Sequence, residues 1–60
     1  MDTETFISDR QLGERYQCHR TTIWRWARNG KFPPPISLAA RVTRWRMSDV
    51  LAWEQRRVAA

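Results

Sequence analysis

Cysteine and histidine each occur once in this chain of 60 residues, and their scarcity excludes several classes of site. Cys18 has no second thiol to pair with, so an internal disulfide is impossible, which fits a reducing compartment. One Cys and one His are too few ligands for a zinc site. Cys18 and His19 are neighbours whose side chains do not point at one another, and no third group orients them. We therefore expect no enzyme activity, no metal and no cofactor.

Long apolar runs are absent as well. No stretch approaches the ~20 apolar residues of a membrane span, and the N-terminus carries Asp2 and Glu4 in place of the apolar run of a signal peptide. These absences predict a cytoplasmic protein with no membrane partner. We expect residues 1–60 to form a single domain with a marginal core, to which four tryptophans add buried apolar area, and residues 1–5 to form a flexible tail.

Acidic residues are missing from the middle of the chain. Residues 20–46 contain seven arginines and lysines and no Asp or Glu, whereas residues 1–19 carry four acids against two arginines. A basic block with interleaved aromatic residues indicates a polyanionic partner, most often nucleic acid. The alternative is a basic face that is simply solvated.

A first helix is predicted from Ser8 to about Gln17. Residues 8–11, SDRQ, have the form of a capping box, and Phe6 or Ile7 is placed to pack on Leu12 as a hydrophobic staple. Gly13 inside this helix costs about 1 kcal/mol relative to alanine. It indicates either the close approach of another helix or a weak helix.

A second helix is predicted from Arg20 to the Asn29-Gly30 stop. The gap of about three residues between the two helices is typical of a helix-turn-helix. Its apolar stripe is Ile23, Trp26 and Ala27, so Trp24 lies on the opposite, basic face, with core packing as the alternative. A basic helix fits the major groove of DNA, where Arg makes bidentate contacts with guanine.

A hairpin and a third helix are predicted after the three prolines. Residues 36–38 and 43–47 alternate as strands, joined by a loop at residues 39–41, and Ser48 is expected to cap the last helix. A hairpin beside a helix-turn-helix is a wing, so the predicted fold is mainly α with a small β-hairpin wing, in the order helix-helix-hairpin-helix. The prolines are either a stiff spacer for this wing or a polyproline ligand.

The run ISDRQLGERYQCHRTTIWRWARNGKFPPPISL, followed by TRWRMSDVLAW, resembles the AlpA-like phage transcriptional regulators, small relatives of the excisionase and MerR-type winged-helix DNA-binding domains. The resemblance covers residues 7–53. It implies a prophage or mobile-element regulator, or an excisionase-like factor, in the nucleoid of a bacterial host. The implied partners are double-stranded DNA, further copies of the chain, and integrase or RNA polymerase.

The resemblance also implies roles for particular residues. It places the recognition helix at residues 20–28, Arg41 at the wing tip, and Trp45 and Trp53 in the core. With the residue pattern, it gives nine candidate DNA-binding residues: Arg20, Thr21, Thr22, Trp24, Arg25, Arg28, Lys31, Arg41 and Arg44. The wing, residues 36–46, is expected to meet the DNA backbone or minor groove.

Three positions depart from the pattern of that family. Gln17 and His19 stand where glycine and a capping serine are usual, and Ala39-Ala40-Arg41 replaces a loop in which glycine is common. Histidine is a poor helix cap, which predicts a less stable corner or one of different geometry. Alanine tolerates positive φ badly, which predicts a different turn in the wing.

A protein-interaction module that docks an acidic partner on the basic face is the main alternative from another class. RNA binding is the third, because no sheet with exposed stacking aromatics is predicted. Steep salt dependence of binding separates DNA from a protein partner, since only DNA binding releases many condensed counterions.

Overall fold

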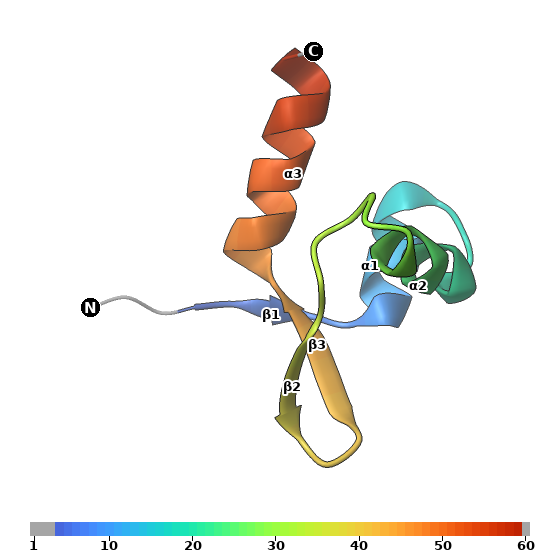
Figure 1. Ribbon diagram of the computed structural model, residues 1–60, viewed down its shortest axis with the longest axis vertical. Helices are drawn as coiled ribbons and strands as arrows, with labels where there is room; N and C mark the ends of the chain where they lie inside the picture. The colour runs from blue at the N-terminus through green and yellow to red at the C-terminus, as the bar shows by residue number, and fades with distance from the viewer. Residues whose placement is uncertain (1–3, 60) are drawn as a thin grey trace.

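The computed structural model describes residues 4–59, with side chains described through residue 57. The chain forms six elements: β1 (Phe6–Ile7), α1 (Asp9–Tyr16), α2 (Arg20–Arg28), β2 (Ile36–Ala39), β3 (Val42–Arg46) and α3 (Met47–Ala59). The strands make one antiparallel sheet in the order β1-β3-β2. Helices α1 and α2 pack together on one side, while the wing of β2 and β3 and helix α3 extend in opposite directions (Figure 1). The predicted class, helices with a β-hairpin wing, is confirmed.

A third strand, β1, was missing from the predicted order. Phe6 lies opposite Arg46 and Ile7 opposite Trp45. The predicted tail is also too long, because the Thr5 carbonyl accepts a hydrogen bond from the Met47 amide at 2.8 Å. Residues 1–3 of that tail lie outside the described residues. A two-residue strand has no readable alternation, so only its pairing with the distant β3 defines it.

The capping box of α1 is confirmed. Ser8 Oγ accepts from the Gln11 amide at 3.1 Å, and Gln11 Oε1 accepts from the Ser8 amide at 3.0 Å. The helix ends at Gln17, which adopts the left-handed φ of 58° that glycine more often takes. The structure also decides between the two interpretations of Gly13. A Cβ there would lie 2.6 Å from the Cys18 carbonyl oxygen, so Gly13 marks a close approach.

Helix α2 is capped by a residue that was expected to cap poorly. His19 Nδ1 accepts a hydrogen bond from the Thr21 amide at 3.2 Å, so the ring does what the usual serine hydroxyl would do. The helix stops where predicted, since the Asn29 amide bonds to the Arg25 carbonyl and Gly30 takes a left-handed φ of 75°.

The wing and α3 differ from the prediction by about one residue each. The loop consists of Ala40 and Arg41, and Arg41 itself adopts the positive φ of 64°. Helix α3 begins at Met47, so Ser48 is not its cap. Instead, Ser48 lies in the first turn and donates to Glu4 Oε1 at 3.3 Å. Strand β3 runs directly into α3 without a linker, and the Met47 amide is already bonded to the Thr5 carbonyl, just before β1.

Five side chains form the buried core: Leu12, Ile23, Phe32, Trp45 and Val50. The core position of Trp45 is confirmed, and its Nε1 donates to the Pro33 carbonyl at 2.7 Å, which supports the spacer interpretation of the prolines. Trp53 was predicted to be a core residue as well, but it is half-buried at the edge of the core. Phe32 is the core residue that the pattern did not predict. No helix within residues 4–59 is both long enough and apolar enough to cross a membrane.

Candidate nucleic-acid interface

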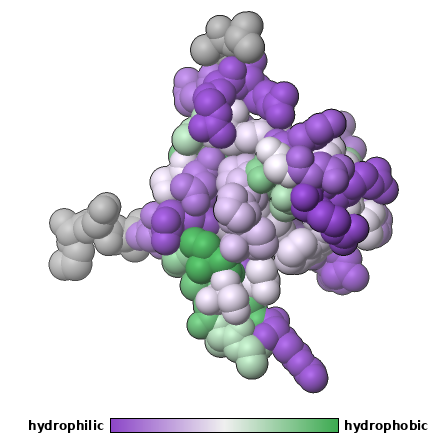
Figure 2. Space-filling model, viewed as in Figure 1, coloured by the Kyte–Doolittle hydropathy of each residue, from purple (hydrophilic) through white to green (hydrophobic). Residues whose placement is uncertain are grey.

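The outer face of α2 is the most basic helical surface of the described chain. Four of the predicted contact residues are exposed on it: Arg20, Thr21, Arg25 and Arg28. On its inner side Ile23 is fully buried, which fixes the rotation of the helix. In residues 4–57, neither Arg25 nor Arg28 has a carboxylate within 4.0 Å. A space-filling view shows a strongly hydrophilic surface on the side of α1 and α2 (Figure 2).

The N-terminal end of α2 is partly closed by its histidine cap. The Thr21 amide is bonded to His19 Nδ1, and the Thr22 amide to the His19 carbonyl at 2.9 Å. Thr22 is half-buried. The Thr21 hydroxyl also lies 3.0 Å from His19 Nδ1, so groups at this end of α2 are already engaged within the fold.

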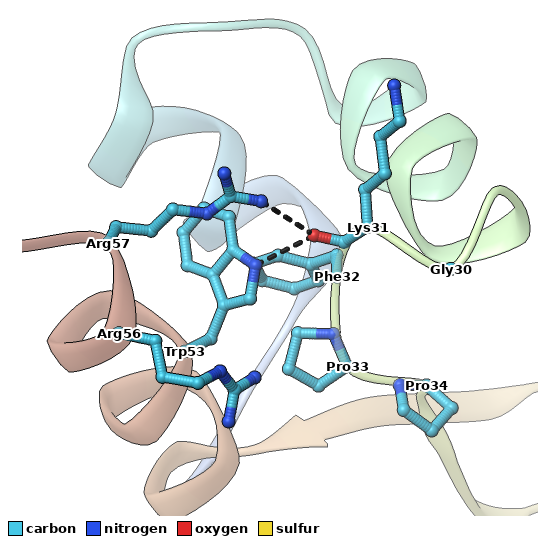
Figure 3. A pocket seen from close by; sticks show the side chains of 8 residues that line it. All are labelled: Gly30, Lys31, Phe32, Pro33, Pro34, Trp53, Arg56 and Arg57. Atoms are coloured by element: carbon cyan, nitrogen blue, oxygen red, sulfur yellow. Dashed lines mark hydrogen bonds between the residues drawn. The ribbon is translucent and has the colours of Figure 1, made fainter. Parts of the chain in front are cut away.

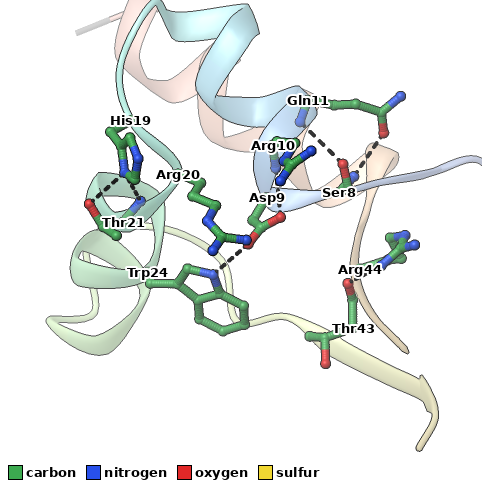
Figure 4. A network of polar contacts seen from close by, with 10 residues as sticks. All are labelled: Ser8, Asp9, Arg10, Gln11, His19, Arg20, Thr21, Trp24, Thr43 and Arg44. Carbon is green, nitrogen blue, oxygen red and sulfur yellow. Dashed lines mark hydrogen bonds and ion pairs between the residues drawn. The ribbon is translucent and has the colours of Figure 1, made fainter. Parts of the chain in front are cut away.

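The carboxylate of Asp9, in α1, lies beside the basic face of α2 (Figure 4). Asp9 Oδ2 accepts from Trp24 Nε1 at 2.9 Å and lies 3.9 Å from Arg20 Nη1. Asp9 Oδ1 accepts from the Arg10 amide at 2.7 Å. Burial raises the pKa of Asp9, but these two hydrogen bonds and the Arg20 charge outweigh it and leave the pKa below its ordinary value. Asp9 is thus ionised wherever DNA binding would be measured.

Trp24 is half-buried rather than free on the basic face. Its ring packs edge-on against the buried Trp45, with centroids 5.0 Å apart, and its N–H is used by Asp9. Both interpretations of this residue therefore hold in part, since one edge contacts the core and the remainder meets solvent. Its role as a DNA contact stays a prediction.

The structure separates the two predicted arginines of the wing. Arg41 is exposed at the tip of the hairpin. Side chains alternate along β3, so Arg44 lies on the opposite face of the sheet from the buried Trp45 and from the α1–α2 pair that packs there. Arg44 is half-buried, and its Nη1 donates to the Thr43 carbonyl at 2.8 Å. The structure therefore does not bring Arg44 onto one surface with α2.

The outward face of the sheet is apolar as well as basic. Phe6, Leu38 and Val42 are exposed by 38%, 47% and 37%. The wing accordingly shows the most hydrophobic surface of the view in Figure 2. These exposed apolar side chains make the outward face of the sheet chemically different from the basic outer face of α2.

A second basic surface, which we call the α3 pocket, was not predicted. It is lined by residues 30–34 and by three residues of α3, Trp53, Arg56 and Arg57 (Figure 3). The Arg57 guanidinium lies 4.8 Å from the centre of the Trp53 ring and donates to the Lys31 carbonyl at 3.3 Å, and Trp53 Nε1 donates to the same carbonyl at 2.7 Å. The exposed Lys31 therefore lies between the end of α2 and this pocket. The sequence offered one sign of this pocket: Trp53 and Arg57 are four residues apart, which places them on the same face of a helix.

Helix α3 is joined to α1 by a charged clamp. Arg15 donates to both carboxylate oxygens of Glu54, at 2.6 and 2.8 Å, and the Tyr16 hydroxyl donates to the same carboxylate. The Arg15 hydrogen bond, helped by Tyr16 and opposed by burial, lowers the pKa of Glu54 to about 2. Burial and the neighbouring carboxylate raise the pKa of Tyr16 to about 12. The clamp thus connects α1 of the helix-turn-helix to α3 through side chains far apart in the sequence.

No group of three or more potential metal-binding side chains is present among the described residues.

Comparison with known proteins agrees with this arrangement of helices. The chain is 42% identical over 40 residues to the uncharacterized protein ORF88 of Enterobacteria phage P4, a stretch covering 67% of this chain and 46% of that protein. The chain thus spans less than half the length of this relative, and no solved structure gives a significant match. Residues 8–58, most of the chain, match the helix-turn-helix domain, and the chain belongs to that family.

Proposed function

We propose that this domain binds double-stranded DNA in a sequence-specific manner, with α2 in the major groove. The observation that carries the proposal is the outer face of α2, where the exposed Arg25 and Arg28 have no carboxylate within 4.0 Å among residues 4–57 and the opposite side of the helix is buried. Such a helix fits the width of the groove, and its guanidinium groups match the O6 and N7 acceptors of guanine.

The residues divide into readers of bases and positioners on the backbone. We assign Arg25, in the middle of the exposed face, to a base edge. Arg28 and Lys31, at the end of α2, are assigned to phosphates, which fix the register without reading sequence. Arg41 at the wing tip is assigned to the backbone or minor groove beside the helix, where a narrow groove attracts arginine.

We further propose that the protein is a prophage or mobile-element regulator, or an excisionase-like factor. The resemblance to AlpA-like regulators and the similarity to a protein of phage P4 support this role. A domain of this size reads few base pairs, so several copies are expected to bind neighbouring sites, with integrase or RNA polymerase as further candidate partners.

Fluorescence anisotropy of a labelled duplex tests the proposal. Binding to random DNA is measured from low to physiological salt, and a tight-binding duplex is then selected from a random pool and measured in the same way. We expect affinity to fall steeply with salt and the selected duplex to bind more tightly than random DNA at every salt concentration. No binding at low salt would reject the proposal.

Docking of an acidic protein segment is the second candidate function, and the α3 pocket favours it. Three cationic side chains, Lys31, Arg56 and Arg57, line the pocket beside the Trp53 ring. If this were the main function, removing both α3 arginines would abolish binding of a poly-glutamate probe, while duplex DNA would bind weakly and without sequence preference.

A further inference from the structure

Asp9 is an acid in a place where an acid weakens DNA binding. Its carboxylate lies next to the N-terminal end of α2, and α2 has no acidic residue in its own first turn. A carboxylate there repels approaching phosphates and competes with them for Arg20. Asp9 also stabilises the start of α1, because an acid in the first turn of a helix interacts favourably with the helix dipole. Asp49 has the same role in the first turn of α3, but only Asp9 also lies beside an arginine of α2. The position of Asp9 therefore calls for a further role.

The contacts of Asp9 link the core to the recognition helix. Trp45 is fully buried, Trp24 packs edge-on against it, and Trp24 Nε1 fixes Asp9 Oδ2 at 2.9 Å. The Arg10 amide fixes the other oxygen. Arg20, with half of its side chain exposed, is the member of this series that reaches solvent on the face of α2. Figure 4 shows its guanidinium and the Trp24 indole both directed at the carboxylate.

We propose that Asp9 is a specificity-determining positioning residue for DNA recognition: it directs the Arg20 guanidinium toward a base edge and keeps phosphate out of the same place. This inference rests on the proposed DNA binding. An arginine that is free to swing contacts phosphates, which carry no sequence information. The Asp9 carboxylate lies 3.9 Å from Arg20 Nη1 without a hydrogen bond, so its charge attracts the guanidinium toward one side and reduces the conformational freedom that Arg20 loses on binding.

The substitution Asp9→Asn tests the proposal because the amide oxygen can still accept from Trp24 Nε1. Removing the charge should let random DNA bind about threefold more tightly at low salt, as expected for one lost repulsion near the phosphates. The ratio of selected to random affinity should fall about tenfold, the scale of one base contact. Asp49→Asn, the matched control in α3, should leave that ratio unchanged. Thermal melts of both variants show whether they are folded.

A double-mutant cycle with Arg20→Ala separates positioning from a structural effect. If Asp9 acts through Arg20, Asp9→Asn no longer changes the selected-to-random ratio once Arg20 is alanine. Trp24→Phe, which keeps the ring packing but removes the N–H that holds Asp9, should lower the ratio in the wild-type background. An unchanged ratio in Asp9→Asn, or equal changes on selected and random DNA, would overturn the proposal. A wild-type protein without any sequence preference would instead reject the proposed function itself.

Discussion

Replacing Gly13 with alanine tests how closely the two helices of the helix-turn-helix must approach. The new Cβ would lie 2.6 Å from the Cys18 carbonyl oxygen and 3.3 Å from the Arg20 amide nitrogen. Both are backbone atoms, so neither can rotate away as a flexible side chain would. The Cys18 amide also bonds to the Gly13 carbonyl at 2.8 Å, which ties the turn to the position that must expand. Helix α2 therefore has to move as a unit.

The magnitude follows from two opposing effects. Alanine gains about 1 kcal/mol over glycine inside a helix. Overpacking costs typically about 1–3 kcal/mol, and a clash with rigid backbone belongs at or above the upper end. We expect a net loss of about 2 kcal/mol in the free energy of unfolding. In a domain of this length, that loss lowers the melting temperature by about 8–16 °C.

The assay is a thermal melt followed by circular dichroism, combined with anisotropy on selected and random DNA. Gly30→Ala is the control, because its Cβ meets no atom within 4 Å and its cost comes from the left-handed φ of 75° alone. Gly13→Ala should displace α2 and reduce binding to the selected duplex more than binding to random DNA. A Gly13→Ala protein that is more stable than wild type, with unchanged DNA binding, would refute the close-approach argument and return Gly13 to a weak point of α1.

Three further predictions concern charge. Arg25→Ala should weaken binding to the selected duplex by ~1–3 kcal/mol and relax the base preference. Lys31→Ala should weaken binding to all sequences alike and reduce the salt dependence by about one phosphate contact. Anisotropy on selected and random DNA distinguishes the two variants, and equal losses on both duplexes for Arg25→Ala would contradict a base contact. Glu54 has a pKa of about 2 in the fold against 4.5 ordinarily, so the unfolded chain takes up its proton first as pH falls. The contribution of ionised Glu54 to the free energy of unfolding is complete above pH 4.5 and lost by about pH 2. Because solvent screens the partly exposed ion pair with Arg15, we expect this contribution to be about 1–2 kcal/mol in urea melts. The Glu54→Gln variant should lack the pH dependence that comes from this site. Arg41→Gly should leave unfolding within about 1 kcal/mol of wild type but weaken DNA binding, and unchanged affinity would remove Arg41 from the interface.

Features set by neighbouring residues could be predicted from the sequence. The capping box at residues 8–11, the left-handed stop at Gly30 and the alternation of the hairpin depend on local hydrogen bonds and side-chain periodicity. Strand β1 could not be predicted because its two residues carry no period. Phe32 has a core position because Lys31 and Pro33 on either side of it bond to Trp53 and Trp45, which are distant in the sequence.

The same limit applies to the candidate site. Helical spacing correctly placed Arg25 and Arg28 together on an exposed face. The nearness of Asp9 to Arg20 could not be predicted, because it depends on how α1 and α2 pack, including the close approach of Gly13 to the backbone of residues 18–20. Alternation along β3 already separated Arg44 from Trp45, but only the packing of α1 and α2 shows which face of the sheet the two helices cover.

Among the described residues, two residues other than glycine adopt a positive φ. Gln17 and Arg41 both occupy left-handed positions that cost a side chain about 1–2 kcal/mol relative to glycine. The Gln17 backbone amide caps α1 by bonding to the Glu14 carbonyl at 3.3 Å, a bond that glycine would make equally well. Arg41 is exposed at the wing tip, and no hydrogen bond or ion pair of its side chain is present in residues 4–57. Among the described residues, the Arg41 side chain makes no hydrogen bond or ion pair that glycine would lose, so Arg41→Gly is the substitution that isolates its proposed contact with DNA phosphate.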